Sequence, residues 1–194
     1  MRGSVAGFRA TREVRPPCND PDVRIAAVSD THLPKFGRSL PRALIDGIRS
    51  AGVDLIAHLG DFTEPFVPAL FDALGPFDAV AGNNDGQELV ARFGRRKVLV
   101  LDGVRLGLTH GDLGMGSWTT PERARSAFAA DDVAAVLFGH SHAPLVKRVP
   151  DGPLLVNPGS PTDKRAQPRF SWALVEIEGG AVRAELRFFD DRSP

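Results

Sequence analysis

Polar side chains of the types that bind metal ions follow directly on apolar runs of this sequence. The run Ile25–Val28 stops at Ser29, and Asp30 and His32 come next, separated by one residue. A short run of β-branched and small apolar residues is typical of a buried strand, and α/β sheets place their ligands at the carboxyl ends of such strands. The sequence therefore predicts one site at these strand ends. Four more runs end in the same way, on Asp61, on Asn83 to Asp85, on His110, and on His140 with His142.

The residues at these ends offer carboxylate, imidazole and amide ligands but no thiolate. Such donors suit Mn²⁺, Fe, Zn²⁺ or Ni²⁺, whereas Ca²⁺ prefers oxygen alone and structural zinc favours Cys. The candidate ligands exceed the number that one such ion uses, and two divalent ions that share a carboxylate would account for them. Of these metals, manganese is the one that we expect the site to bind. The candidate ligands are Asp30, His32, Asp61, Asn83, His110, His140 and His142.

The charge of such a centre would attract phosphate although the chain is neutral overall. Lys plus Arg and Asp plus Glu number 24 each, so no long-range field marks nucleic acid or a membrane as the main partner. The carboxylates of Asp30 and Asp61 would leave two divalent ions with a charge of roughly +2. A water bridging both ions would have its pKa lowered toward neutrality and would supply hydroxide for in-line attack on phosphorus.

The elements that must position these residues alternate between strand and helix in the first half. After the first strand, an apolar stripe predicts a helix over 40–51, with Ser39 as its N-cap and Gly52 at its end. A strand over 53–59, a helix over 64–74 and a strand over 77–81 follow. This β-α-β-α-β order predicts a parallel sheet with crossover helices.

The second half is richer in strands. Two strands flank the hairpin signal Asp102-Gly103, and a helix is predicted over 121–130 with Thr119 or Thr120 as its cap. A buried strand over 133–138 precedes several short ones, which we expect to be mostly antiparallel. Two sheets packed face to face with helices outside fit this order better than one doubly wound sheet, so the expected class is α/β (α+β). The short strands are predicted over 145–149, 154–156, 172–177 and 182–188.

Length and composition indicate one domain. The chain has 194 residues, 42% of them hydrophobic, which suits a single domain over 23–194. Residues 1–22 lack periodicity and predict a poorly ordered tail. The single Cys18 agrees with a reducing compartment, and no apolar run approaches the roughly 20 residues that span a membrane. We expect a cytoplasmic protein with no signal peptide, and the sequence sets no oligomeric state.

The five motifs SDTH, GDFTE, GNND, THGD and GHSH, in this order, resemble the signature of the calcineurin-like metallophosphoesterases. The compact chain is similar to the small prokaryotic phosphodiesterase branch. The resemblance implies a β-sandwich in a four-layer αββα arrangement. It also implies hydrolysis of phosphodiesters or small activated phosphate esters by a metal-bridging hydroxide. The alternative is a scaffold of the same fold that binds metal without turnover. By this resemblance Asp30, His32 and His142 would hold one ion, Asn83, His110 and His140 the second, and Asp61 would bridge them.

Two positions depart from the family pattern. Larger relatives place a His where this chain has Asn84, which can donate a hydrogen bond to a leaving group or phosphate but no proton. The small branch often has a His where this chain has Asp112, and that acid could either orient a ligand or weaken phosphate binding by repulsion.

Of the other residues, His58 is expected to make a buried structural or supporting hydrogen bond. The run Arg95–Lys97 predicts a solvated loop, with contact to phosphate or nucleic acid as the alternative. Asn157–Ser160 predicts a turn by composition, and the resemblance implies that this turn packs near the site.

Overall fold

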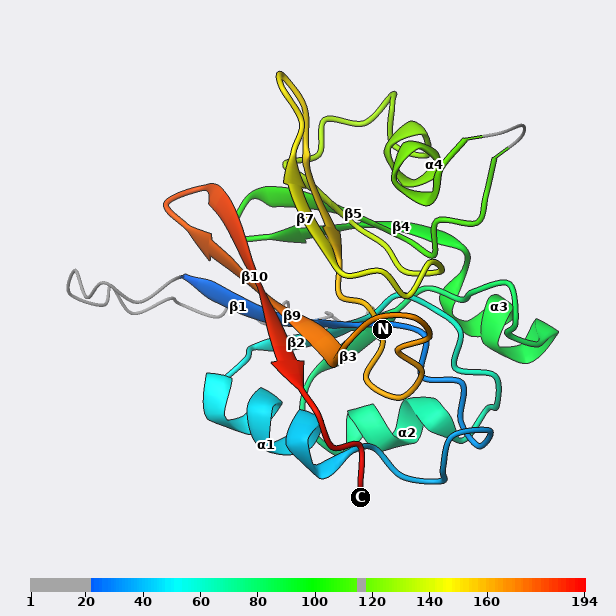
Figure 1. Cartoon of the computed structure of the whole chain (residues 1–194). Helices are drawn as coiled ribbons and strands as arrows, with labels where there is room; N and C mark the ends of the chain where they lie inside the picture. Colours follow the sequence, from blue (N-terminus) through cyan, green and yellow to red (C-terminus); the bar gives the residue numbers. More distant parts are fainter. Residues whose placement is uncertain (1–21, 115–117) are drawn as a thin grey trace, which may run out of the picture.

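The computed structural model describes residues 22–114 and 118–194, which form two five-stranded sheets packed face to face (Figure 1). The tail predicted for residues 1–22 lies almost wholly outside the described residues, so its disorder stays a prediction. Among the residues that the structure describes, no helix has the length and apolar character needed to cross a membrane.

The first sheet has the order β10-β9-β1-β2-β3. Strands β1, β2 and β3 are parallel, as their alternation with helices predicts, and β9 pairs antiparallel with both β1 and β10. The Ile25–Val28 part of β1 is buried throughout, which explains why it is apolar without alternation. The strands are β1 (Val23–Val28), β2 (Leu55–His58), β3 (Phe77–Ala79), β9 (Phe170–Glu178) and β10 (Ala181–Phe189).

The second sheet has the order β4-β5-β6-β8-β7. Its three central strands β5, β6 and β8 are parallel, and β4 and β7 pair antiparallel at the two edges. The predicted hairpin at Asp102-Gly103 joins β4 to β5. The strands are β4 (Arg96–Leu101), β5 (Val104–Thr109), β6 (Ala135–Leu137), β7 (Leu145–Arg148) and β8 (Leu154–Asn157).

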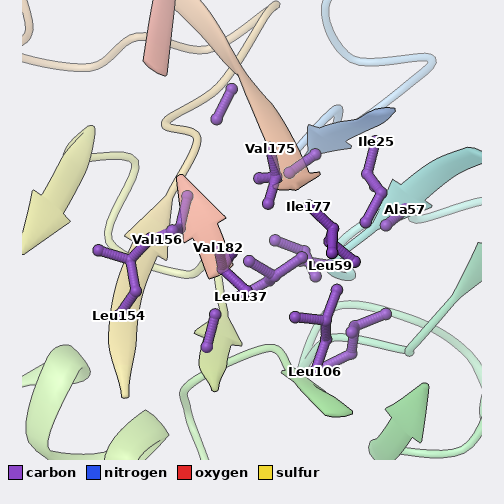
Figure 2. Close-up of a cluster of buried hydrophobic side chains, with 14 of the residues drawn as sticks. Ile25, Ala57, Leu59, Leu106, Leu137, Leu154, Val156, Val175, Ile177 and Val182 are labelled. Carbon is purple, nitrogen blue, oxygen red and sulfur yellow. The ribbon is translucent and has the colours of Figure 1, made fainter. Parts of the chain in front are cut away.

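The main core lies between the two sheets. Figure 2 shows Val175, Ile177 and Val182 of the first sheet facing Leu137 and Val156 of the second. A second apolar cluster joins the outer face of the first sheet to α1, α2 and α3, and a third joins the second sheet to α4. These four layers confirm the predicted fold class (Figure 1). The helices are α1 (Arg42–Ala51), α2 (Val67–Asp72), α3 (Gln87–Phe93) and α4 (Thr120–Ser126).

The ends of the helices differ from the sequence predictions in detail. The N-cap of α1 is Pro41, and no side chain caps it, so the predicted role of Ser39 is wrong. Gly52 does end α1 in the left-handed conformation, with φ at 59°. Helices α2 and α4 are shorter than predicted, and α3 was not predicted.

Candidate metal centre

The carboxyl ends of five strands meet at one edge of the sandwich. Asp30 and His32 follow β1, Asp61 follows β2, and backbone hydrogen bonds join these two segments. The Asp30 amide donates to the Gly60 carbonyl at 3.0 Å, and the His32 amide donates to the Asp61 carbonyl at 3.0 Å. On the second sheet, the Gly139 amide donates to the His110 carbonyl at 3.0 Å, which ties β5 to the loop after β6.

Two carboxylate oxygens lie at the middle of the cluster. Oδ2 of Asp61 is 3.3 Å from Nε2 of His110 and 3.5 Å from Nε2 of His32. Oδ1 of Asp30 is 3.3 Å from Nε2 of His142, 3.8 Å from that of His32 and 4.0 Å from that of His110. The first sheet supplies both carboxylates and one imidazole, and the second sheet supplies the other two imidazoles.

Asn83 and His140 form the more open side of the cluster. Oδ1 of Asn83 is 2.9 Å from Nδ1 of His140, and the His110 and His140 rings meet edge to face with centroids 5.2 Å apart. Asn83 is exposed and His140 is half-buried, whereas Asp30, His110 and His142 are buried. The structure thus brings all seven candidate ligands together and leaves the Asn83 side accessible to solvent.

The buried atoms of this cluster fit metal ligands. Oδ1 of Asp30 and Nε2 of His110 are buried and make no hydrogen bond of acceptable geometry. Nε2 of His32 lies 3.2 Å from Nε2 of His142, while Nδ1 of His142 donates to the Asp163 carbonyl at 2.5 Å. Nε2 of neutral His142 therefore carries a lone pair, and a proton or cation must lie between the two rings. Two overlapping groups could hold an ion among the described residues, Asp30 with His32 and His142, and Asp30 with Asp61 and His110.

The two carboxylates are ionised. Burial would raise the pKa of Asp30, but the contact with His142 and the charge of His110 outweigh it and lower that pKa. Burial would likewise raise the pKa of Asp61, and the contacts with His110 and Asn84 lower it well below its ordinary value. Both side chains are therefore anionic near neutrality, the form that binds a cation.

The imidazoles respond to the same charges. Burial would lower the pKa of His110, but the Asp61 and Asp30 carboxylates raise it to about 9. Burial lowers the pKa of His32 and of His140, which favours the neutral form that ligates metal. Nδ1 of His110 points to the Leu59 carbonyl at 2.7 Å, so its Nε2 is directed into the cluster.

Five of the seven candidate ligands adopt a left-handed backbone conformation. Such a conformation costs about 1–3 kcal/mol in a non-glycine residue, and strain of this kind concentrates at functional sites. The sharp turns redirect each side chain from the strand axis into the cluster. The φ angles are 57° at Asp30, 45° at His32, 61° at Asp61, 69° at His140 and 57° at His142.

Asp85 and Asn84 hold Asp61 in place. Oδ2 of Asp85 accepts hydrogen bonds from the amides of Asp61 at 2.9 Å and Gly82 at 2.7 Å, and Oδ1 accepts from the Thr63 amide at 2.8 Å. The Asn84 amide donates to Oδ1 of Asp61 at 2.9 Å, and its side-chain Nδ2 donates to Oδ2 at 2.6 Å. The side chain that we expected at a leaving group therefore contacts the central carboxylate. The GNND motif contains both residues, but their hydrogen bonds to the Asp61 segment become visible only in the structure.

The loop after β8 supports the other carboxylate. Oγ of Ser160 donates to the Asp30 carbonyl at 2.7 Å, and Oγ1 of Thr162 donates to the Thr31 carbonyl at 2.6 Å. Asn157 reaches the loop after β6 through the Gly139 carbonyl at 2.9 Å. Composition identified Asn157–Ser160 only as a turn, and its place near the site was implied by the family resemblance alone. The Ser160 and Thr162 side chains find their partners in backbone groups more than a hundred residues away.

His58 has the buried supporting role that we expected. Nδ1 accepts from the Gly60 amide at 3.2 Å, so Nε2 is the protonated nitrogen and donates to Oγ1 of Thr31 at 3.3 Å. The ring stacks on Phe62 with centroids 3.8 Å apart, and burial lowers the pKa of His58 to about 3. A neutral imidazole thus fixes the turn between β2 and Asp61.

A hollow among the described residues lies away from the candidate ligands. It has a volume of about 740 Å³ and is bordered by α4 and by the turn between β7 and β8, including Trp118, Phe128 and Gly152. None of the seven candidate ligands borders it. Hollow shape alone would therefore have pointed away from the metal-binding residues.

A fold of two sheets with carboxylates and imidazoles at five strand ends defines a metallophosphoesterase. The sequence model of the calcineurin-like phosphoesterase superfamily domain matches residues 23–180. The chain belongs to this superfamily, which confirms the resemblance in the motifs. It is 32% identical over 162 residues to a probable metallophosphoesterase of Methanothermobacter thermautotrophicus, covering 84% of this chain and 90% of that protein. It is also 32% identical to a probable metallophosphoesterase of Bacillus subtilis, covering 87% and 91%.

Solved structures share the fold. A Thermotoga maritima protein is 30% identical, with a TM-score of 0.64 over 86% of this chain and 99% of that one. A structure described as a novel archaeal phosphodiesterase is 24% identical, with a TM-score of 0.64 over 84% and 99%. Vps29 from Entamoeba histolytica is 21% identical, with a TM-score of 0.68 over 86% and 99%. The last two likenesses concern the fold alone.

Proposed function

We propose that this protein is a phosphodiesterase that uses two divalent metal ions, manganese first among the candidates. The observation that carries the proposal is the position of Oδ2 of Asp61 between Nε2 of His32 and Nε2 of His110, at 3.5 and 3.3 Å. A carboxylate oxygen in that position can serve two ions at once. In the proposed arrangement Asp30, His32 and His142 hold one ion, Asn83, His110 and His140 hold the second, and Asp61 is shared.

Bound divalent ions would activate water and offset the charge of a phosphate group. The chain contributes the ligand atoms and their orientation. The Leu59 and Asp163 carbonyls accept from Nδ1 of His110 and His142, so the Nε2 atoms are left for metal. The carboxylates of Asp30 and Asp61 are ionised and so offer two anionic ligands to the ions. Substrate would enter on the exposed Asn83 side.

A preference for esters with good leaving groups follows from Asn84. This side chain stands at the position of a His in larger relatives, and an amide cannot protonate a departing oxygen. One solved structure of the same fold is described as an archaeal phosphodiesterase. We propose a small phosphate ester as the substrate, in the cytoplasm, with no membrane partner, and we place nucleic acid second to small esters without excluding it. The overall neutral charge and the single Cys18 support this choice.

The test is a substrate screen with purified full-length protein, stripped with chelator and reloaded with Mn²⁺. We expect bis(4-nitrophenyl) phosphate to be hydrolysed with a higher kcat/KM than 4-nitrophenyl phosphate, and Asp61→Asn to abolish both activities. The matched control is Asp54→Asn, an exposed position at the opposite ends of the strands. Metal uptake without hydrolysis of either ester would refute the proposal and favour the non-catalytic scaffold.

A further inference from the structure

Arg95 and Asp112 form an ion pair beside the candidate metal centre. Nη2 of Arg95 contacts Oδ2 of Asp112, and the two side chains are only 26% and 14% exposed. The sequence predicted a solvated loop over Arg95–Lys97, and this was wrong. Arg96 begins β4, and the side chains of Arg96 and Lys97 also form ion pairs, with Asp131 and Asp78. Spacing along the chain gave no sign of these partners.

Arg95 ties together two loops that come from different sheets. Its Nη1 donates to the Gly82 carbonyl at 2.7 Å, in the turn after β3. The Arg95 carbonyl accepts from Oγ1 of Thr109 at the end of β5, at 3.5 Å. The preceding Gly94 carbonyl accepts from the Ala81 amide at 2.7 Å. The segment that carries Arg95 is thus fixed on both sides, and its guanidinium spans the gap between the loops.

Both loops supply ligands of one proposed ion. Gly82 immediately precedes Asn83, and Asp112 lies two residues after His110. The charge of Asp112 also reaches His140, the third ligand of the same group. We propose that Arg95 and Asp112 are positioning residues, which fix Asn83 against His110 and so set the affinity of the ion held by Asn83, His110 and His140. This inference rests on the proposed function.

The pair also decides between the two roles that the sequence left open for Asp112. With Arg95 as its partner, Asp112 has its negative charge offset, so its repulsion of a phosphate group is weakened. Its remaining effect is geometric, because it anchors the guanidinium that holds the Gly82 turn. Oδ1 of Asp112 and Nε of Arg95 are buried without a hydrogen-bond partner among the described residues. Removing either side chain would therefore leave the other charge without compensation.

Positioning and plain electrostatics predict different outcomes for single substitutions. If the pair acted only through charge, Arg95→Gln would leave a carboxylate near the second ion and tighten its binding, whereas Asp112→Asn would weaken it. If the pair acts by positioning, both substitutions weaken the binding of that ion. Loss of a group that supports metal ligands typically costs about 10–100-fold in metal affinity.

The experiment is Mn²⁺ titration calorimetry on chelated full-length protein and on Arg95→Gln, Asp112→Asn and the double variant. Asn83→Ala identifies which binding event belongs to the second ion. We expect that event to weaken by about 10–100-fold in all three variants, with the double variant no worse than the worse single one. Arg95→Lys should restore part of the affinity. The other ion should bind as in the native protein.

The matched control is the double variant Arg92→Gln/Asp72→Asn. It removes an ion pair between Arg92 of α3 and Asp72 of α2, which are 3.3 Å apart and each 50% exposed. It should change neither binding event. Tighter binding in Arg95→Gln, or unchanged binding in both single variants, would overturn the inference.

Hydrogen exchange separates this inference from the proposed function. In metal-free Arg95→Gln, the amides of residues 82–86 should exchange faster than in the native protein, because Gly82 and its turn lose their anchor. Unchanged exchange in that segment would refute the claim that Arg95 anchors the Gly82 turn. A native protein that binds two ions but hydrolyses no ester would refute only the proposed function. A native protein that binds a single ion would overturn both the two-ion proposal and the role in metal affinity.

Discussion

Gly82 offers a direct test of how tightly the Asp61 carboxylate is packed. A Cβ at this position would lie 2.2 Å from Oδ1 of Asp61 and 2.5 Å from its backbone amide nitrogen. The side-chain oxygen would have to retreat by about 1 Å to reach an ordinary separation, and the backbone nitrogen cannot retreat without moving the loop. Gly82→Ala should therefore displace the central ligand of the site.

The magnitude has two parts, the overpacking itself and the hydrogen bonds that a shifted loop weakens. Overpacking typically costs about 1–3 kcal/mol. The weakened bonds are those that the amides of Asp61 and Gly82 donate to Asp85, and a bond to a charged acceptor contributes about 1.5–3 kcal/mol. We expect Gly82→Ala to lower the free energy of unfolding by about 3–6 kcal/mol. Because a misplacement of about 1 Å can cost 10²-fold in rate, activity should fall at least that far.

Urea unfolding of chelated protein, followed by Trp fluorescence, measures the stability, and elemental analysis of the reloaded protein measures the metal content. Gly75→Ala is the control, since a Cβ there would meet nothing within 4 Å and should change the free energy by no more than about 0.5 kcal/mol. If the free energy of unfolding of Gly82→Ala lies within about 1 kcal/mol of the native value and the variant keeps full metal, the packing argument is wrong.

Three further predictions concern the ligands themselves. In metal-free protein, the raised pKa of His110 stabilises the fold fully below about pH 6.5, and this contribution of about 3 kcal/mol should be lost as the pH rises through about 9. Unfolding between about pH 6 and 10 measures it, and His110→Gln should remove that part of the pH dependence. Asp61→Asn should lose more metal, by elemental analysis, than Asn83→Ala, because Asp61 is the shared ligand in the proposed arrangement; equal losses would contradict the shared role. Since Asn84 cannot donate a proton, kcat/KM should depend steeply on leaving-group pKa across a series of diesters. Asn84→His should flatten that dependence, and general-acid help is typically worth about 10²–10⁴-fold. A flat dependence in the native protein would show that another group supplies the proton.

The strand ends were predictable because a change from apolar to polar residues marks each of them within a short stretch of sequence. Buried parallel strands are continuously apolar, so the position where Ile25–Val28 gives way to Asp30 can be read from a few residues. The order of the predicted strands and helices also predicted two packed sheets. Groups that act from within one segment, such as Gly52 at the end of α1, were predictable for the same reason.

The supporting groups were not predictable, because their partners are distant in sequence. Ser160 and Thr162 contact backbone carbonyls of the β1 loop, and Arg95 meets Asp112 only after two sheets have packed together. No local pattern marks such interactions. The side-chain amide of Asn84 illustrates the same limit, since its hydrogen bond to Asp61 depends on the turn of the whole loop.

The left-handed ligands have an evolutionary consequence. Each of the five holds its conformation against a local preference for other backbone angles, and in the proposed function metal coordination is what offsets that cost. In a lineage that no longer needs catalysis, replacing Asp30 or His142 by glycine or asparagine would relax the backbone and remove a buried ionisable group. Such a descendant would keep the sandwich, lose the metals and gain thermal stability. Loss of these ligands would therefore relieve backbone strain, so the fold by itself does not favour keeping them.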